Sequence, residues 1–197
     1  MIPDGWSKTD LLSLSSNGLM NGAFNDPKLV GTGYKLINVV NLYSEPYIKT
    51  TELELLNLPS SDYEKFKAEK CDIFFTRSSL KLEGIAHCNI FLDNREDVIF
   101  ECHIIRARPD KSKIDPRYLH YFCVSPNARK HFMSYAKTTT MTTIDQNGIG
   151  SLNVLLPPLL EQCRIAEVLG VWDESIGEVD WEDSIAQAGA DAAVIDW

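Results

Sequence analysis

The sequence predicts an α+β domain, rich in mixed sheet and carrying small helices, followed by a projecting C-terminal helix. Three observations predict it. Short runs dense in Ile, Val and Phe fill much of the first 110 residues, two proline-initiated amphipathic helices follow, and a double proline introduces the last helix. Strands and helices segregated along a chain in this way are typical of α+β folds. A length of 197 residues with 44% hydrophobic residues suits one medium-sized domain with an appendage.

The strand predictions rest on runs of β-branched and aromatic residues that are bounded by turn residues. Asn-Gly pairs and isolated glycines mark turns before the first of these runs. In chain order the predicted strands cover residues 35–43, 71–79, 84–92, 97–109 and 151–156. The middle of the chain therefore has a pattern of strand, basic turn, strand, acidic turn and strand.

Helices are predicted where a capping residue or a proline precedes an amphipathic pattern. Residues 61–70 follow a Ser-Ser-Asp cap, and the pairs Asp115-Pro116 and Ser125-Pro126 open two further helices. A polar segment, residues 136–150, then leads into the last predicted strand. These elements place the main domain within residues 1–156.

The last helix is predicted over residues 157–177 and has the pattern of an interaction surface. Its apolar positions step by four, three and four residues, which is the spacing of a coiled-coil seam. They are Ile165, Leu169, Trp172 and Ile176. The helix is therefore expected to project and contact a partner, although ordinary core packing explains the same pattern. Residues 178–197 form a separate acidic, alanine-rich tail, for which either a weak continuation of the helix or disorder is compatible with the composition.

The net charge of -9 is distributed unevenly along the chain. Residues 1–160 hold 18 basic and 18 acidic side chains, whereas residues 161–197 hold one base and ten acids. Residues 102–140 hold eight bases and two acids. A polyanionic partner is therefore compatible with this sequence, and the basic strip is its expected binding region.

The five cysteines include no CxxC pair, so neither a disulfide framework nor a zinc ribbon is expected. Cysteine and histidine lie near each other at His87-Cys88, Cys102-His103 and His120 with Cys123. Each pair lies in an apolar stretch, which favours structural thiols over ligands. No metal site is predicted.

Motifs of catalysis are missing from the sequence. The GxSxG elbow, the GxxxxGK[ST] loop, the HExxH helix and the GxGxxG turn are all absent. Pro109-Asp110 could open a metal-dependent nuclease motif, but the acid and lysine that should follow are missing. The sequence therefore predicts no catalytic residue and no cofactor held by this chain. Long apolar runs and a signal peptide are also missing, so a cytoplasmic location without membrane contact is expected.

A reader of duplex DNA needs cations for phosphates and short polar or forked side chains for base edges. The candidates lie on turn-like segments, and solvated turns, local ion pairs or structural hydrogen bonds explain many of them as well. Arg77, for example, could pair with Glu83 instead. The candidate DNA-binding residues are Arg77, Ser78, Ser79, Lys81, Lys111, Lys113, Lys137, Thr138, Thr139, Thr140, Thr142, Thr143, Asn38 and Asn41.

Several blocks in order resemble the DNA-specificity (S) subunit of type I restriction-modification systems, and within it a single target-recognition domain. Residues 72–79 resemble the GDIL-(F/S)-R-S-G strand and turn of that family, and Pro3-Asp4-Gly5-Trp6 is similar to its entry. Residues 103–106 and 116–129 look like the next blocks. The most specific block is residues 156–166, LPPLLEQCRIA, which is close to the family's LPPLxEQxxIA.

The resemblance implies a non-enzymatic half-subunit that recognises double-stranded DNA. Methyltransferase (M) subunits and a restriction (R) subunit would be its partners, and it would form a homodimer through the C-terminal helix. S-adenosylmethionine, ATP and Mg2+ are expected on those partner subunits, not on this chain. Family members usually carry two recognition domains, so a dimer would rebuild a pseudo-symmetric whole and read a palindromic, interrupted target.

Two alternatives remain open on the sequence. The chain could be an orphan protein-interaction module that regulates a restriction complex through its acidic tail without reading DNA. It could also be a fragment of a nuclease, which the missing acid-lysine pair disfavours. The acidic tail stands where the family's basic continuation of the helix would be expected, and the DNA target itself cannot be read from these residues.

Overall fold

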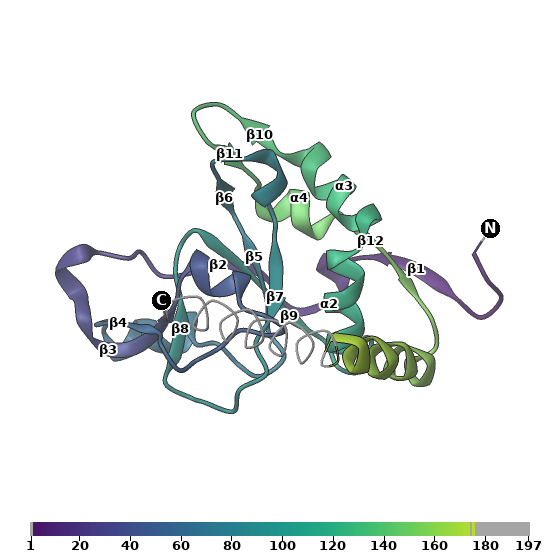
Figure 1. Cartoon of the computed structure of the whole chain (residues 1–197), viewed down its shortest axis with the longest axis horizontal. Helices are drawn as coiled ribbons and strands as arrows, with labels where there is room; N and C mark the ends of the chain where they lie inside the picture. The colour runs from purple at the N-terminus through teal and green to yellow at the C-terminus, as the bar shows by residue number, and fades with distance from the viewer. Residues whose placement is uncertain (1, 174, 176–197) are drawn as a thin grey trace, which may run out of the picture.

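A computed structural model describes residues 2–173 and residue 175 of the chain. A four-stranded antiparallel sheet lies at its centre, in the order β2, β9, β5, β7 (Figure 1). Within the described residues, no helix has the length and apolar character needed to cross a membrane. The strands of the central sheet are β2 (Ser15–Asn21), β9 (Ile104–Pro109), β5 (Ile73–Thr76) and β7 (Cys88–Ile90).

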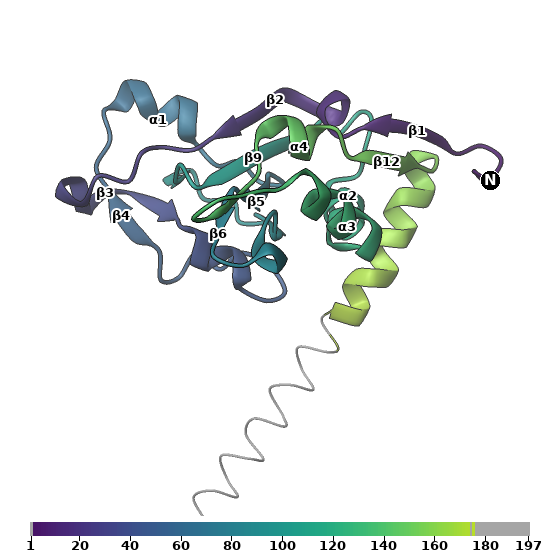
Figure 2. The same cartoon turned by 90° about the horizontal axis from the view of Figure 1, so that it is seen from above.

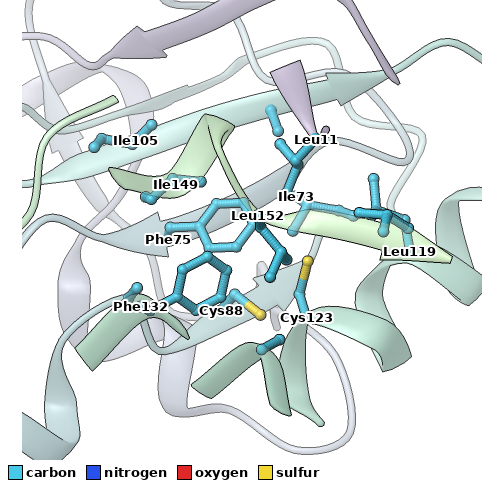
Figure 3. Close-up of a cluster of buried hydrophobic side chains, with 14 of the residues drawn as sticks. Leu11, Ile73, Phe75, Cys88, Ile105, Leu119, Cys123, Phe132, Ile149 and Leu152 are labelled. Atoms are coloured by element: carbon cyan, nitrogen blue, oxygen red, sulfur yellow. The ribbon is translucent and has the colours of Figure 1, made fainter. Parts of the chain in front are cut away.

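Both faces of the central sheet are covered, as the continuous apolar sequence of β5 requires. All four residues of β5 are buried. Phe75 packs with Phe132 in one cluster, whereas Phe74 contacts Phe100 in a second cluster on the other face. Figure 3 shows the first cluster, in which the thiols of Cys88 and Cys123 lie among apolar side chains.

A second, mixed sheet has the order β4, β3, β8. Its β3 pairs antiparallel with β4 and parallel with β8, so the predicted mixed α+β architecture is confirmed. The predicted strand at residues 97–109 is in fact two strands in two different sheets, because a turn separates β8 from β9. The strands of this sheet are β3 (Val30–Ile37), β4 (Glu54–Leu56) and β8 (Val98–Phe100).

The strand predicted over residues 35–43 also ends early. β3 stops at Ile37, and the 3-10 helix η3 (Val39–Tyr43) follows. Asn38 and Asn41 favour the change, because the side-chain Oδ1 of Asn41 accepts from the backbone N–H of Asn38 and the backbone N–H of Asn41 donates to the carbonyl of Asn38. β-propensity of the Val and Leu residues is overridden here by local side-chain hydrogen bonds.

Two helices begin at the caps that the sequence predicts, because Asp115 and Ser125 each accept a backbone N–H bond at the helix start. The helix predicted over residues 61–70 is shorter and lacks the predicted cap, since Pro59 is its N-cap and makes no side-chain bond. Asp145 caps α4, a helix inside the segment expected to be only a polar connection. The predicted helices after Pro116 and Pro126 are confirmed. The helices are α1 (Ser60–Phe66), α2 (Pro116–Val124), α3 (Pro126–Tyr135) and α4 (Gln146–Gly150), with short 3-10 turns η1 (Leu12–Leu14), η2 (Pro27–Leu29) and η4 (Leu82–Gly84).

The two ends of the domain meet in a two-stranded pair. β1 (Ser7–Asp10) lies antiparallel to β12 (Asn153–Leu156), and a helix over residues 159–173 follows the double proline. Figure 2 shows this C-terminal helix beside α2 at one edge of the molecule. Gln162 ties the two together, because its Oε1 accepts from the backbone N–H of Asp115 at 2.8 Å and its Nε2 donates to the carbonyl of Pro157.

A small three-stranded sheet extends from the same end of the domain as α3 and α4 (Figure 1). Its order is β10, β11, β6, and all pairs are antiparallel. None of its strands was predicted as a sheet of its own. The strands are β10 (Lys137–Thr138), β11 (Thr142–Thr143) and β6 (Ser78–Ser79).

Candidate nucleic-acid interface

The small sheet brings together two segments that the sequence marks independently as DNA-binding candidates. Thr142 lies opposite Ser79, and Thr143 lies opposite Ser78. On its other side, Thr143 pairs with Lys137 of β10. The basic turn after β5 and the threonine-rich run before α4 are therefore one continuous surface.

Hydrogen bonds to the turn before β9 hold the chain that enters β6. The backbone N–H of Arg77 donates to the carbonyl of His103 at 2.8 Å, and its Nη1 lies 3.3 Å from the carbonyl of Cys102. The Oγ of Ser78 lies 2.8 Å from Nδ1 of His103. The described structure pairs Arg77 with no acidic side chain, and Glu83 is bonded instead through its carbonyl to Arg129. The Arg77 guanidinium is half-buried at the base of the turn.

The turn between β6 and η4 presents its tip to solvent. The Oγ of Ser79 accepts from the backbone N–H of Lys81 at 3.2 Å, so Ser79 supports the turn. Gly84 makes this possible, because a Cβ there would lie 2.4 Å from that same Oγ. Leu80 is 85% exposed and Lys81 is exposed beside it. Leu80 was not among the predicted contact residues, although an apolar residue within a polar turn is a sequence signal for an exposed contact.

The β10-β11 hairpin carries the threonine run. The side chains of Lys137, Thr138, Thr139 and Thr140 are exposed, and Lys137 lies 3.5 Å from Asp145. Thr142 is the exception, because only 2% of it is exposed and its Oγ1 is 3.1 Å from that of Thr138. Thr142 therefore supports the hairpin and cannot itself reach a ligand, which corrects its place among the contact candidates.

A cleft of about 550 Å³ opens between this turn and η3. Its wall mixes hydroxyls, one lysine and one histidine with exposed apolar side chains and with two acidic residues, Glu83 and Glu101. Leu80 comes from the turn between β6 and η4, and Met141 comes from the turn of the β10-β11 hairpin. Residues that line it include Val39, Tyr43, Ser78, Ser79, Leu80, Lys81 and Met141.

Asn38 and Asn41 lie next to this cleft but are already engaged. Asn41 Oδ1 accepts from the backbone N–H of Asn38 at 2.8 Å, and Asn38 Nδ2 donates to Glu54 at 2.7 Å. Both amides shape η3, which positions Val39 and Tyr43 at the cleft. These bonds favour the structural explanation for both residues, and a direct contact of Asn38 or Asn41 with DNA stays a prediction.

The basic strip predicted over residues 102–140 is only partly a surface. Arg106 is 5% exposed and donates to the carbonyl of Lys67, and burial lowers its pKa. Arg108 bonds to the buried carboxylate of Asp72 at 2.8 Å and to Glu69 at 2.6 Å. Burial lowers the pKa of Arg108, but the bonds and charge of Asp72 outweigh it and the net shift is upward. These two arginines hold the fold together.

Lys111 and Lys113 lie away from the small sheet. Lys113 Nζ is 3.1 Å from Asp110 and also donates to the carbonyl of Ser13 in η1. Both lysines are exposed in the loop between β9 and α2. The structure therefore does not bring them to the surface that Arg77 and Lys137 share.

The C-terminal helix packs one face on α2 and exposes the other. The hydroxyl of Tyr121 donates to Asp173 at 2.9 Å, and burial raises the pKa of Tyr121. Of the predicted seam, Ile165 is half-buried against the core, Leu169 is 38% exposed and Trp172 is 65% exposed. Ile176 lies outside the described residues. Val168 and Val171, at 58% and 62% exposure, extend the apolar face and were missed.

Fold and surface together define an α+β recognition domain, with a hydroxyl-rich and cationic hairpin surface and a separate apolar helix face. The family of the type I restriction modification DNA specificity domain matches residues 25–178. The chain belongs to this family. The resemblance drawn from the sequence blocks is thereby confirmed.

Curated relatives agree with the family match. The chain is 29% identical to the Type I restriction enzyme EcoKI specificity subunit of Escherichia coli over 75% of this chain and 32% of that protein. It is 28% identical to the putative type I restriction enzyme MjaX specificity subunit of Methanocaldococcus jannaschii, over 91% of this chain and 42% of that one. The chain thus spans less than half the length of these relatives. They give no support to the alternative of a regulatory module that does not recognise DNA.

Solved structures show the same fold. The HsdS subunit from Thermoanaerobacter tengcongensis matches with a TM-score of 0.68 at 18% identity, over 98% of this chain and 48% of that one. A chain from a study of complex assembly and conformational transition of the type I R-M system matches with a TM-score of 0.71 at 15% identity, over 98% of this chain and 44% of that one. The sheet arrangement is therefore shared despite wide sequence divergence.

Proposed function

We propose that this chain recognises one half-site of double-stranded DNA through the small sheet β10-β11-β6 and the cleft beside it. The observation that carries the proposal is the pairing of Ser78 and Ser79 with Thr143 and Thr142, which joins the two polar segments into one surface. Exposed threonine hydroxyls with Lys137 and Lys81 suit phosphates, and short polar side chains suit base edges.

Within this surface we assign different tasks to different side chains. Lys81 is exposed in the turn between β6 and η4, and Lys137 is exposed in β10 beside Asp145. Both fit phosphate contacts whose strength falls with salt. Arg77 is held at the base of the turn by the carbonyl of Cys102, and a guanidinium fixed in this way suits bidentate contact with guanine. Leu80 fits an apolar contact with a thymine methyl or a widened base step.

The proposal also covers the assembly of this chain with a second copy and with partner subunits. We infer that residues 1–156 form the recognition domain and residues 157–177 the docking helix, with residues 178–197 as an acidic tail. The exposed apolar face at Val168, Val171 and Trp172 supports a homodimer through this helix. Catalysis would then belong to the methyltransferase and restriction subunits, together with S-adenosylmethionine, ATP and Mg2+, and this chain would be non-catalytic.

Selection of bound sequences from a random duplex pool tests this function. The full chain is incubated with the pool in the presence of its methyltransferase subunits, because non-specific affinity is expected to come largely from those partners. The expected result is enrichment of one short motif, repeated as an interrupted palindrome. A pool that stays random through successive rounds, while the methyltransferase subunits remain bound to the chain, would contradict the proposal.

A further inference from the structure

The turn between β8 and β9 gathers three different ligand types. One ligand atom each from Glu101, Cys102 and His103 lies within 4.8 Å of the other two. A carboxylate, a thiol and an imidazole make up a donor set that suits Zn2+ and its softer neighbours rather than Mg2+ or Ca2+. The sequence singled out only Cys102 and His103 as a pair, and the fold of the turn brings the carboxylate of the preceding residue, Glu101, close to both.

The backbone of this turn is pinned on several sides. The N–H of Ile104 donates to the carbonyl of Glu101, which closes the turn, and the N–H of Glu101 donates to the carbonyl of Ile37. On the opposite side, Arg77 bonds to the carbonyls of Cys102 and His103. A site on so constrained a backbone is preorganised, because little chain entropy remains to be lost on binding.

Glu101 is largely enclosed by the protein, because only 7% of the residue is exposed. Within the described residues, its carboxylate oxygens are not among the buried side-chain atoms that lack a hydrogen-bond partner, so they reach the solvent of the cleft. Glu101 faces the cleft described above together with His103, so an ion has an entry path and a position for a water ligand.

His103 already has the support that metal-bound imidazoles usually have. Its Nδ1 lies 2.8 Å from Ser78 Oγ, and a bond of this kind fixes the ring and leaves the other nitrogen for a ligand role. The charge also balances. A divalent ion with one carboxylate and one thiolate is neutral, so the neighbouring Arg77 guanidinium adds no net repulsion.

We propose that Glu101, Cys102 and His103 bind one Zn2+ ion, with water in the fourth position. Tetrahedral zinc with bond lengths of 2.0–2.3 Å needs ligand atoms about 3.3–3.8 Å apart, so side-chain rotation within the turn suffices to close the site. The bound ion would brace the turn against β6 through His103 and Ser78. This site does not depend on the proposed DNA function, since its ligands and its test involve no DNA.

Metal titration of the purified full chain, freed of metal with a chelator, tests the site. Co2+ reports a thiolate ligand through its sulfur-to-metal charge-transfer absorption, and Zn2+ then displaces it. The expected result is one equivalent of Co2+ with this absorption. The Cys102→Ser variant should lose the absorption and bind Zn2+ more than about tenfold more weakly. Cys71→Ser and Cys163→Ser, matched changes at two other partly exposed cysteines, should behave as the wild type.

Three results would overturn the proposal. The first is an affinity of Cys102→Ser for Zn2+ equal to that of the wild type. The second is loss of the Co2+ charge-transfer absorption in Cys71→Ser or Cys163→Ser. The third is a wild-type titration in which no single equivalent of metal saturates the protein. Circular dichroism shows whether Cys102→Ser folds. If it does not, Glu101→Gln decides, since the proposal requires weaker Zn2+ binding with the thiolate absorption kept, and unchanged affinity would refute it.

Discussion

Thr142 of β11 lies directly opposite Ser79 of β6, although 62 residues separate them in the chain. This antiparallel pairing turns two short polar segments into one sheet. Ile144 continues the ladder, because its backbone N–H donates to the carbonyl of Arg77 at 3.0 Å. The proposed DNA surface thus depends on the pairing of β6 with β11. Substitutions of its exposed side chains should weaken DNA binding more than they reduce the stability of the fold.

Arg77→Ala is expected to weaken binding to the selected duplex by about 1–3 kcal/mol, since a guanidinium contact with a base is lost. The effect on the random duplex should be smaller. Fluorescence anisotropy at several salt concentrations measures both. Equal affinity of the variant and the wild type for the selected duplex at every salt concentration would remove Arg77 from the interface.

Leu80→Ala tests the apolar tip of the turn. Because Leu80 is 85% exposed, its truncation should leave the unfolding free energy unchanged while binding to the selected duplex weakens by about 1–2 kcal/mol. Phe24→Ala is the matched control, since Phe24 is 73% exposed but lies in the segment between β2 and β3. Equal losses in the two variants would argue against a specific contact by Leu80.

Arg108→Ala should destabilise the domain by about 3–5 kcal/mol, because it leaves the buried carboxylate of Asp72 without its partner. Urea unfolding followed by circular dichroism measures the loss. Lys111→Ala, an exposed basic residue on the adjacent loop, should change stability by less than about 0.5 kcal/mol. A small effect of Arg108→Ala would mean that Arg108 is not structural.

Asp145 is expected to couple the stability of α4 to pH. Its pKa lies below the ordinary 3.8, chiefly because the backbone N–H of Gly148 donates to it. A lowered pKa means that the stabilisation is present above 3.8 and is lost as pH falls through the folded value. Asp145→Ala should therefore cost about 1 kcal/mol near neutral pH and progressively less in acid. A difference in unfolding free energy between the wild type and Asp145→Ala that is the same at all pH values would show that the charge of Asp145 does not stabilise α4.

Trp172→Asp probes the exposed helix face. Trp172 is 65% exposed on the helix that otherwise packs on α2, so the change should spare the fold and convert a dimer into a monomer. Light scattering of both proteins at the same concentration measures it. Glu167→Ala, at an exposed polar position of the same helix, should leave the mass unchanged. A dimer that survives Trp172→Asp would place the interface elsewhere.

Local sequence patterns predicted the helices and strands of this fold better than the long-range contacts between them. The caps at Asp115 and Ser125 act within four residues and were visible in the sequence. The break between β8 and β9 was missed, because only the short segment of residues 101–103 interrupts the apolar run, and the two strands pair with partners far away in the chain. Arg106 and Arg108 were read as surface charges, since their partners Lys67 and Asp72 lie more than 35 residues away.

The candidate site shows the same division. The sequence marked Arg77–Ser79 and the threonine run by side-chain chemistry, and the structure joined them. Burial of Thr142 and the capping roles of Asn38 and Asn41 needed coordinates. The apolar tip at Leu80 was overlooked, although an apolar side chain within a polar turn is a signal that marks it.

The most direct test of the central claim is photo-crosslinking from the small sheet. A photo-crosslinking amino acid is placed at the exposed Thr139, and in a second protein at the exposed Lys111 of the β9-α2 loop. Each is irradiated on the selected duplex with the methyltransferase subunits bound. The account predicts that position 139 crosslinks to nucleotides of the half-site and that position 111 does not. Crosslinking from position 111 with none from position 139 would contradict it.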